Sequence, residues 1–430
     1  MSERKEGKPG NEKSKQDNKN KKNNDIFSAC FPGLVDLVIH KEKICYLYKN
    51  QGELQVLDRI KMSEKYYKPP DSYALPFKPL PAKKILAYQK DDEEKLYYSI
   101  IDKLKTISAL PSEMHYHLVA DYIFFTYLSE EAHYFPYLWF FGLPERGKSR
   151  TVKCVFNLSY RGLYTETLNQ AYIFRFAELF HGTLVLDMYE LSKRARMKDS
   201  YDLLLGRFEK GMKIPRVTAF DKGPFEDMKY YEVYGPTILA TNTEIPENDP
   251  LRSRCIRIIM PEARGIYPDN SDEDFIDIKA RLLAFRARHQ DNPLPNIDKP
   301  IPGRLGDLMH PLLQIAKLLP EDALKNLESL VEEVEVERKE SQAETLAGKI
   351  AHALYHLRGE VDKGRLPVTV LIDSLNKGSI YRSSDQAVGR ELSAMGIQRK
   401  KSMGTMHIIW NLEGMEQIWK RYSIPSKESP

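Results

Sequence analysis

The chain has 430 residues, of which 42% are hydrophobic, 29% charged and 10% aromatic, so it is long enough for two or three domains with buried cores. The net charge is only +4, so any binding to nucleic acid depends on where basic residues cluster and not on the total. The four cysteines lie far apart in the sequence, which argues against a zinc finger and against a disulfide framework. No apolar run is long enough to span a bilayer. We therefore expect a soluble, cytoplasmic protein that does not bind a membrane.

The N-terminal third is predicted to contain three segments. Residues 1–25 carry eight Lys or Arg and five acidic residues and lack apolar side chains after Met1, which predicts a disordered basic tail. The tail is either a solubilising arm or a tether for nucleic acid. In residues 26–67, alternating apolar residues from Leu34 to Leu57 predict three short strands of a small β module. Residues 68–93 are rich in proline and predict a linker.

The middle of the chain, residues 94–264, alternates strand and helix patterns. Two helical patterns come first, in Glu94–Ala132, and the apolar run Pro136–Gly142 then predicts a strand that is buried on both faces. A helix is predicted over Lys148–Leu158. Further strand candidates are Gly162–Thr165, Thr183–Leu186, Pro236–Thr241 and Cys255–Met260, separated by helical stretches such as Asn169–Phe180 and Tyr201–Lys210. The alternation predicts an α/β fold, a parallel sheet with helices on both faces. Residues 265–344 read as a helical region that ends in a charged connector.

A phosphate-binding motif follows the first of these strands. Residues Gly142–Ser149 read GLPERGKS and match G-x-x-x-x-G-K-[ST] at every fixed position. Because the motif ends a strand and opens a helix, the loop would surround the phosphates of ATP with backbone amides. We expect Lys148 to reach the β and γ phosphates and Ser149 to bind Mg²⁺. The predicted loop residues are Gly142, Leu143, Pro144, Glu145, Arg146, Gly147, Lys148 and Ser149.

A nucleotide hydrolase also needs a carboxylate at the end of a neighbouring strand to hold the metal, and a base for the attacking water. Asp187 ends the apolar run in GTLVLDMYEL and is the candidate metal ligand. The next residue, where a glutamate would usually polarise the water, is Met188. Glu190 is either the replacement base or an ordinary acid in the first turn of a helix.

Two later residues complete the candidate catalytic set. Asn242 ends the run ILATN, where it either orients the lytic water or caps the following turn. In LRSRC, Arg254, with Arg252 as the second choice, would reach a γ-phosphate bound by an adjacent subunit. The alternative for this arginine is a salt bridge facing solvent.

This order of motifs resembles the AAA+ ATPases, and more narrowly the helicases of mobile elements related to superfamily 3 and to minichromosome-maintenance helicases. The matching segments are PYLWFFGLPERGKSR, AYIFRFAELFHGTLVLD, YGPTILATN and LRSRCIRIIMP. The resemblance implies five parallel strands, ATP sites shared between subunits and a homo-oligomeric ring, usually a hexamer, with single-stranded DNA in its channel. It also implies a β-hairpin before the sensor strand, here within Lys213–Tyr234, with Lys222 at its turn contacting DNA. The family's glutamate after the strand-end aspartate is replaced by Met188.

Residues 345–425 are predicted to form a separate domain. Three helical patterns, the last starting at a capping box of Ser383 and Gln386, precede a strand, a turn and a strand in IQRKKSMGTMHIIWN. This order is typical of a winged helix-turn-helix that binds duplex DNA, although such domains also bind proteins. Gln386 and Arg390 would face the groove, and the phosphate contacts would come from Arg399, Lys400 and Lys401.

Taken together, these patterns predict an ATP-driven DNA motor, a ring-forming helicase or translocase of a mobile genetic element. The alternative is an ATP-binding initiator or DNA-binding protein with weak or no hydrolysis, which the missing glutamate at Met188 keeps open. A small-molecule kinase would explain the phosphate loop, but it would explain neither Arg254 nor the basic C-terminal pattern.

Overall fold

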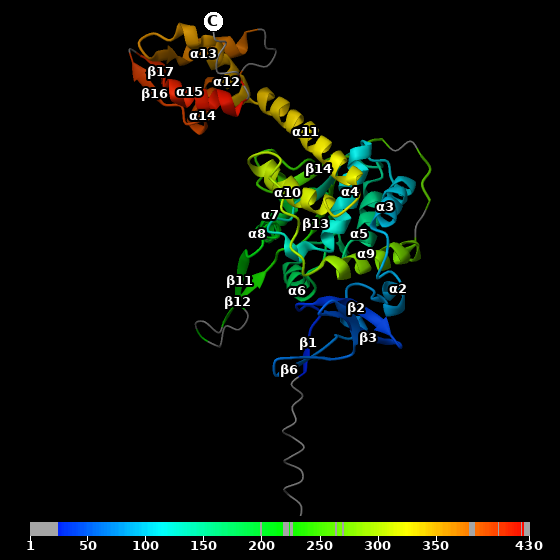
Figure 1. The fold of residues 1–430 in the computed structure, drawn as a ribbon. Coiled ribbons are helices and arrows are strands. Elements are labelled where there is room, and N and C mark those ends of the chain that lie inside the picture. The colour runs from blue at the N-terminus through cyan, green and yellow to red at the C-terminus, as the bar shows by residue number, and fades with distance from the viewer. Residues whose placement is uncertain are drawn as a thin grey trace, which may run out of the picture. The chain divides into compact units, whose positions relative to one another are not determined.

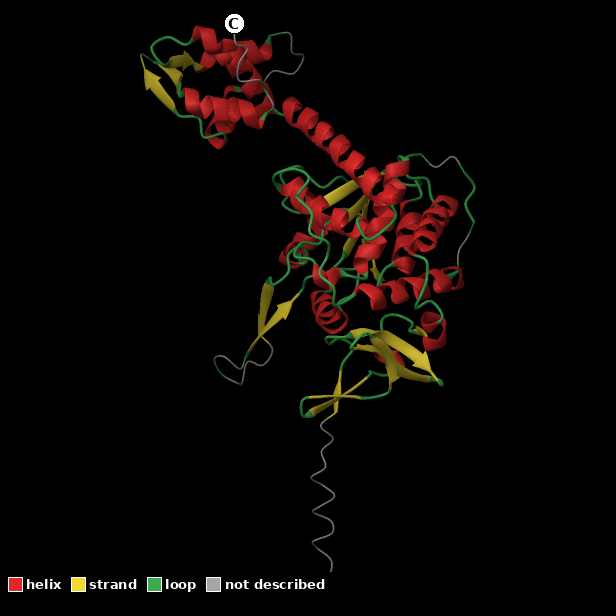
Figure 2. Cartoon of the chain, viewed as in Figure 1, coloured by secondary structure: helices red, strands yellow, loops and turns green. Residues whose placement is uncertain are grey.

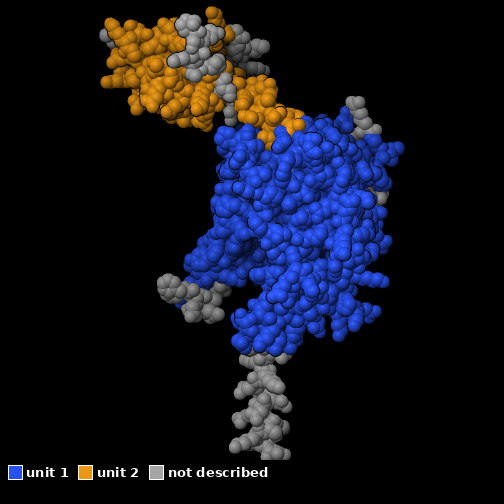
Figure 3. All heavy atoms as spheres, viewed as in Figure 1, with its two compact units in different colours: residues 1–328 blue, residues 329–430 orange. Residues whose placement is uncertain are grey.

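The computed structural model describes residues 25–197, 200–217, 223, 227–262, 265–268, 271–377, 383–402, 404–422 and 424. The chain divides into two compact units, residues 1–328 and 329–430 (Figure 3). Their helices and strands are labelled in Figure 1 and coloured by type in Figure 2. Within the described ranges, we find no helix with the length and hydrophobicity of a membrane span.

The first unit is built on a five-stranded sheet in which all strands are parallel. Its strands are β8 (Tyr137–Phe141), β9 (Leu163–Thr165), β10 (Leu184–Asp187), β13 (Thr237–Thr241) and β14 (Cys255–Ile259). They lie in the order β14-β8-β13-β10-β9. Each predicted strand is present, and the run Pro136–Gly142, predicted to be buried on both faces, has that burial in β8; β13 is buried in the same way. The α/β class is confirmed.

Helices pack around this sheet. Helix α5 (Lys148–Leu158) has the predicted bounds and packs against β8, β9, β10 and β13. The other helices of the unit are α2 (Ala82–Leu86), α3 (Glu93–Ile107), α4 (Glu113–Thr126), α6 (Gln170–Phe180), α7 (Leu191–Met197), α8 (Tyr201–Gly206), α9 (Ile276–His289), α10 (Arg304–Ala316) and the first part of α11 (Glu321–Glu344). The helix expected over Tyr201–Lys210 is shorter because residues 207–210 form a turn and an isolated bridge.

The β module precedes the sheet in the chain. The three strands predicted in Leu34–Leu57 are present as β2 (Leu34–His40), β3 (Lys43–Asn50) and β4 (Glu53–Leu57). A second small sheet contains β1 (Asp25–Phe27), β5 (Ile60–Met62) and β6 (Lys65–Lys68).

The stretch predicted as a proline-rich linker, residues 68–93, is partly structured. It adds strand β7 (Leu80–Pro81) to β2, and its helix α2 packs against α9. The reason is that Leu80, Ala82 and Ile85 are apolar and are buried by these contacts.

A β-hairpin extends from the first unit between β10 and β13. Strands β11 (Lys213–Val217) and β12 (Met228–Glu232) pair antiparallel, as the two runs of the sequence predict, and β12 packs against α6. The predicted contact residue at the turn, Lys222, lies outside the described residues.

The second unit begins within α11, at Ser329. Its further elements are α12 (Leu346–His356), β15 (Arg365–Pro367), α13 (Val368–Asn376), α14 (Asp385–Ala394), β16 (Arg399–Ser402), β17 (Thr405–Ile409) and α15 (Leu412–Arg421). The three strands form one sheet in the order β15-β17-β16. Strand β15 was not predicted, and the predicted capping box is wrong: Ser384, not Ser383, caps α14 and accepts a hydrogen bond from the amide of Ala387.

Candidate nucleotide-binding site

The phosphate-loop motif connects the carboxyl end of β8 to the amino end of α5. Two of its residues have left-handed backbone, Glu145 with φ 67° and Gly147 with φ 75°, and Gly147 is the N-cap of α5. A Cβ on Gly147 would meet no atom within 4 Å, so the space beside the loop at this point is open. The amides of the first helical turn have no partners within the helix, which makes this end of α5 suitable for an anion.

Lys148 is held over this loop. Its side chain is buried, with 5% of the residue exposed, and Nζ donates a hydrogen bond to the carbonyl of Leu143 at 2.7 Å. Burial lowers the pKa of Lys148, while the nearby negative charge of Asp187 acts in the opposite direction. The lysine is therefore positioned between the loop and the strand-end carboxylate, and Ser149 beside it is exposed.

Asp187 ends β10, and its carboxylate accepts a hydrogen bond from the hydroxyl of Tyr164 at 2.6 Å. Burial and the Asp187 charge raise the pKa of Tyr164, so the phenol stays protonated and remains a donor. β10 is not the neighbour of β8, because β13 lies between them. The expectation that the strand carrying the carboxylate is adjacent to the strand of the phosphate loop is therefore corrected.

The residues near the loop fit a magnesium ion that is bound mainly through a nucleotide. No group of three or more His, Cys, Asp or Glu side chains suited to a metal occurs in the described part of the chain. Mg²⁺ needs only one or two protein ligands when phosphate oxygens and water fill its other positions. The exposed hydroxyl of Ser149 and the carboxylate of Asp187 are ligands of that kind.

The residues after Asp187 turn into α7. Met188 is buried, with 4% of its surface exposed, and its amide donates to the carbonyl of Ala240 on β13 at 2.9 Å. Glu190 has left-handed backbone with φ 52° and comes immediately before α7, where its carboxylate lies 3.4 Å from Nζ of Lys193. Glu190 therefore lies at the start of a helix, and its role as a base stays a prediction.

Asn242 follows the end of β13, the strand between β8 and β10. The preceding Thr241 is fixed: its hydroxyl accepts from Nε1 of Trp139 and donates to the carbonyl of Thr243, each at 2.8 Å. Asn242 is half-buried, and its side chain makes no hydrogen bond to the part of the chain that the structure describes. It therefore caps no described turn, and its amide is available between the phosphate loop and Asp187.

The arginines of LRSRC lie at the opposite edge of the sheet. They form a short 3₁₀ turn, Arg252–Arg254, immediately before β14, and Cys255 pairs in register with Tyr137 at the start of β8. The phosphate loop follows the other end of β8, a distance of about 16 Å at roughly 3.3 Å per residue. Arg254 is therefore too far away to act on phosphates bound by its own loop.

The two arginines also differ in their partners. Arg252 donates to Glu244 at 2.9 Å and to the carbonyl of Ile245 at 2.8 Å. Arg254 donates through Nη1 to the carbonyl of Pro250 at 2.8 Å, and its buried Nε has no hydrogen-bond partner among the described residues. Within the described residues a carboxylate thus pairs with the guanidinium of Arg252 and none pairs with that of Arg254, whose role stays a prediction.

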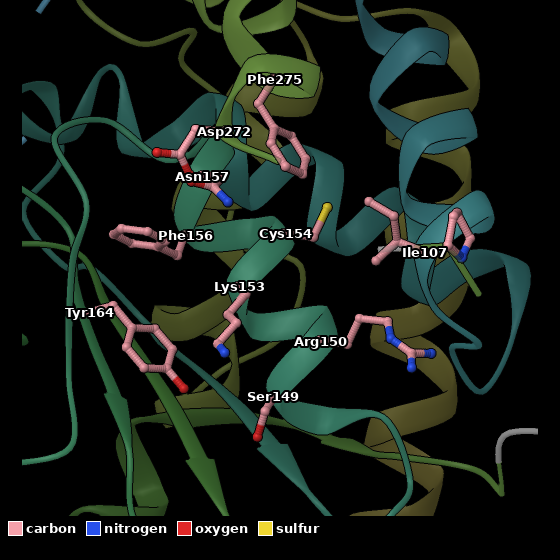
Figure 4. Close-up of a pocket in the computed structure, with 11 residues that line it drawn as sticks. Ile107, Ser149, Arg150, Lys153, Cys154, Phe156, Asn157, Tyr164, Asp272 and Phe275 are labelled. Atoms are coloured by element: carbon pink, nitrogen blue, oxygen red, sulfur yellow. The ribbon is translucent and has the colours of Figure 1, made fainter. Parts of the chain in front are cut away.

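A cavity of about 590 Å³ adjoins the loop along α5, which the sequence had not indicated. Figure 4 shows Ser149, Lys153 and Tyr164 directed to the same side of this helix. Arg150, also in the lining, has its guanidinium carbon 5.2 Å from the ring centroid of Tyr267. The cavity thus combines cationic and aromatic side chains at the amino end of α5. Its lining is completed by Ile107, Cys154, Phe156, Asn157, Pro268, Asp272 and Phe275.

The predicted DNA-binding residues of the second unit lie on α14 and β16. Gln386 and Arg390 are exposed one turn apart on α14, and Lys400 and Lys401 are exposed on β16. Arg399 is different, because its Nη2 donates to the hydroxyl of Ser393 on α14 at 2.7 Å. Its Nη1 lies beside Gly389, 2.7 Å from the position that a Cβ on that residue would take. The structure therefore joins Arg399 to the exposed face of α14 and not to the strand lysines.

No protein-family model matches this chain, and no curated protein matches it. Three solved structures that it resembles are SCCmec type IV Cch, described as an active helicase, the C-terminal region of NrS-1, and Drosophila ORC bound to DNA. The Cch match has 14% identity and a TM-score of 0.37, and covers 87% of this chain and 78% of that chain. The NrS-1 match has 11% identity and a TM-score of 0.36, and covers 88% of this chain and 96% of that chain. The ORC match has 14% identity and a TM-score of 0.19, and covers 84% of this chain and 96% of that chain. With all TM-scores below 0.5, the functional assignment depends on the geometry of the site.

Proposed function

We propose that this protein is an ATP-hydrolysing DNA motor, a ring-forming helicase or translocase of a mobile genetic element. The observation that carries the proposal is that the polar residues are divided between the carboxyl ends and the amino ends of the strands in one parallel sheet. The phosphate loop, Asp187 and Asn242 lie at the carboxyl ends of the strands, and Arg254 lies at their amino ends. Such a division suits an ATP site that is completed by a second copy of the chain.

In this proposal, the chain's own residues bind and orient ATP. The loop amides and Lys148 hold the phosphates, while Ser149 and Asp187 would hold Mg²⁺, which supplies neutralisation of the developing charge. The Tyr164 hydroxyl keeps the Asp187 carboxylate oriented. Asn242 positions the attacking water, and Glu190 accepts its proton after exchanging its contact with Lys193.

The proposed ring follows from the reach of Arg254. An arginine that lies about 16 Å from its own loop, by strand arithmetic, can stabilise a γ-phosphate only in a neighbouring subunit. Repetition of this head-to-tail contact closes a ring when the rotation permits it, and we propose a hexamer. The β11–β12 hairpin would contact single-stranded DNA in the channel, and Lys222, in the sequence between its two strands, is the proposed contact residue.

We also propose that the second unit is a winged helix that binds duplex DNA. The helices α12, α13 and α14, together with a three-stranded sheet in the order β15-β17-β16, support this assignment. The exposed Gln386 and Arg390 on α14 would face the groove, and Arg399, Lys400 and Lys401 would contact phosphates.

Steady-state ATP hydrolysis, measured with and without single- or double-stranded DNA at a fixed salt concentration, tests the proposal. We expect DNA to stimulate turnover, Lys148→Ala to abolish it, and Glu190→Gln to reduce it about 100-fold or more with ATP binding retained. Glu332→Gln, at an exposed position on α11, is the matched control and should leave the rate unchanged. Full activity in Lys148→Ala would contradict the assignment of the nucleotide site.

The buried Met188 favours one second candidate, a nucleotide-switched DNA-binding protein. A thioether at this position cannot accept a proton, and the nearest following acid, Glu190, is already paired with Lys193. Tight ATP binding with negligible turnover, together with nucleotide-dependent affinity for DNA, would support this candidate over the motor.

A further inference from the structure

A second cavity, of about 390 Å³, lies where the β module meets α6 and α9. Cys30, Glu130, Glu178, His181, Arg286 and Gln290 are among the residues that line it. It belongs to the amino edge of the sheet, because His181 comes before β10 while Asp187 ends that strand. The cavity is therefore separate from the proposed nucleotide site.

Cys30 and His181 both line this cavity, and the charge of each affects the pKa of the other. Burial acts to raise the pKa of the Cys30 thiol, but the hydrogen bond and charge of His181, together with the charge of Arg161, bring it below its ordinary value, against a smaller opposing effect of Glu130. His181 is the C-cap of α6, with φ 48°, where the negative end of the helix dipole favours an imidazolium. Each of the two side chains thus favours the charged form of the other.

The other three cysteines have the opposite environment. Cys45, Cys154 and Cys255 are buried, with 5%, 2% and 5% of their surfaces exposed, whereas Cys30 is only partly buried. Burial raises the pKa of each of the three thiols, that of Cys154 to about 12. A thiolate is the reactive form of cysteine, so the chain contains its own unreactive references.

Two buried polar atoms near the pair lack partners within the described residues. Gln290 lines the cavity with 5% of its surface exposed, and its Oε1 accepts no hydrogen bond. Arg161 is 4% exposed and uses Nε and Nη1 on Asp36, Ala29 and Phe180, which leaves Nη2 without an acceptor. Of these two residues Gln290 lines the cavity, and its unused acceptor would orient a small hydroxylic ligand.

We propose that this cavity is a site of thiol oxidation, in which Cys30 reacts with hydrogen peroxide or a similarly small hydroperoxide. The sulfur of Cys30 attacks one peroxide oxygen, an S–O bond forms, and the O–O bond breaks. The leaving hydroxide takes the proton of the His181 imidazolium and departs as water. Sulfur loses two electrons, the peroxide gains them, and the product is a sulfenic acid, which thiols reduce again. This inference does not depend on the proposed ATPase function.

The test uses the full-length, folded protein treated with dilute hydrogen peroxide in the presence of dimedone, with each cysteine peptide quantified by mass spectrometry. Iodoacetamide serves as a second probe, because its reaction measures the thiolate without oxidation. We expect Cys30 to react at least about tenfold faster than the other three cysteines with both reagents. His181→Gln should slow Cys30 about tenfold, and His133→Gln, which changes an exposed histidine outside the cavity lining, should leave the rate unchanged.

Two results would overturn the proposal. One is a Cys30 rate that equals that of free glutathione at pH 7, and the other is a Cys30 rate unchanged by His181→Gln in a folded variant. If that variant does not fold, the pH profile of iodoacetamide labelling in the unaltered protein decides instead. A half-maximal Cys30 rate below pH 8 supports the pair, whereas a midpoint at or above the ordinary thiol value of about 8.5 refutes it.

Discussion

Replacing Gly147 with alanine would test whether the phosphate loop binds ATP in the conformation described. The residue has φ 75°, and a non-glycine residue in left-handed backbone costs about 1–2 kcal/mol. No atom lies within 4 Å of the new Cβ, so crowding by the protein adds nothing to this cost. If the loop keeps its shape, Gly147→Ala lowers the free energy of unfolding by this amount. If the loop relaxes, the same energy appears as a five- to thirtyfold loss of ATP affinity, at about 1.4 kcal/mol per factor of ten.

Bound phosphate would add to this loss, because the new methyl group enters the open space where the phosphate would lie. We therefore expect titration calorimetry to show ATP affinity reduced at least about tenfold in Gly147→Ala. Gly52→Ala is the matched control, since Gly52 has φ 88° and a Cβ added there would also meet no atom within 4 Å, but Gly52 belongs to the β3–β4 turn. The control should lose similar stability in urea unfolding with unchanged ATP affinity. ATP affinity equal to that of the unaltered protein in Gly147→Ala would refute the assignment of this loop.

Three further predictions follow from the same geometry. Arg254→Ala and Lys148→Ala should each be inactive alone. Mixed together they should recover part of the ATPase activity, because the intact loop of the first variant then meets the intact arginine of the second. A mixture of Arg254→Ala with the variant that carries both substitutions should recover none. Burial raises the pKa of Asp121 well above its ordinary 3.8, so the folded protein retains a proton that the unfolded chain releases, and this favours unfolding more as the pH rises. Asp121→Asn removes this effect, so it should raise the urea midpoint of unfolding more at pH 8 than at pH 5. Gly389→Ala would place a Cβ 2.7 Å from Nη1 of Arg399 and so displace that side chain. We expect circular dichroism to show a folded protein, and fluorescence anisotropy to show that its affinity for duplex DNA falls as far as that of Arg399→Ala.

The sheet and the loop were predictable because their signals are local. A continuous apolar run such as residues 137–141 predicts a buried strand, and the motif that follows fixes the start of α5 through its own backbone requirements. The same holds for the three alternating strands of the β module. Strand β7 was missed because proline content indicated a linker, while the buried contacts of Leu80 that stabilise it come from residues far away in sequence.

The composition of the site was less predictable, since it depends on strand order. Chain order alone gives no sign that β13 inserts between β8 and β10, so the separation of Asp187 from the loop strand does not follow from the sequence. Tyr164 was missed because no motif marks a tyrosine that bonds a strand-end carboxylate. The Cys30–His181 pair was likewise invisible, because the two residues belong to separate elements far apart in the chain.

Strand order also gives the proposed motor a short covalent path from DNA to the site of hydrolysis. The hairpin strand β12 ends at Glu232, a few residues before β13, and β13 leads directly to Asn242. The connecting segment is fixed by the fully buried Arg207, which donates to the carbonyls of Val233 and Pro236 at 3.0 and 2.9 Å and to the hydroxyl of Thr237 at 2.8 Å. Because this segment cannot move without breaking buried hydrogen bonds, a displacement of the hairpin would be transmitted to β13 and not absorbed between the strands.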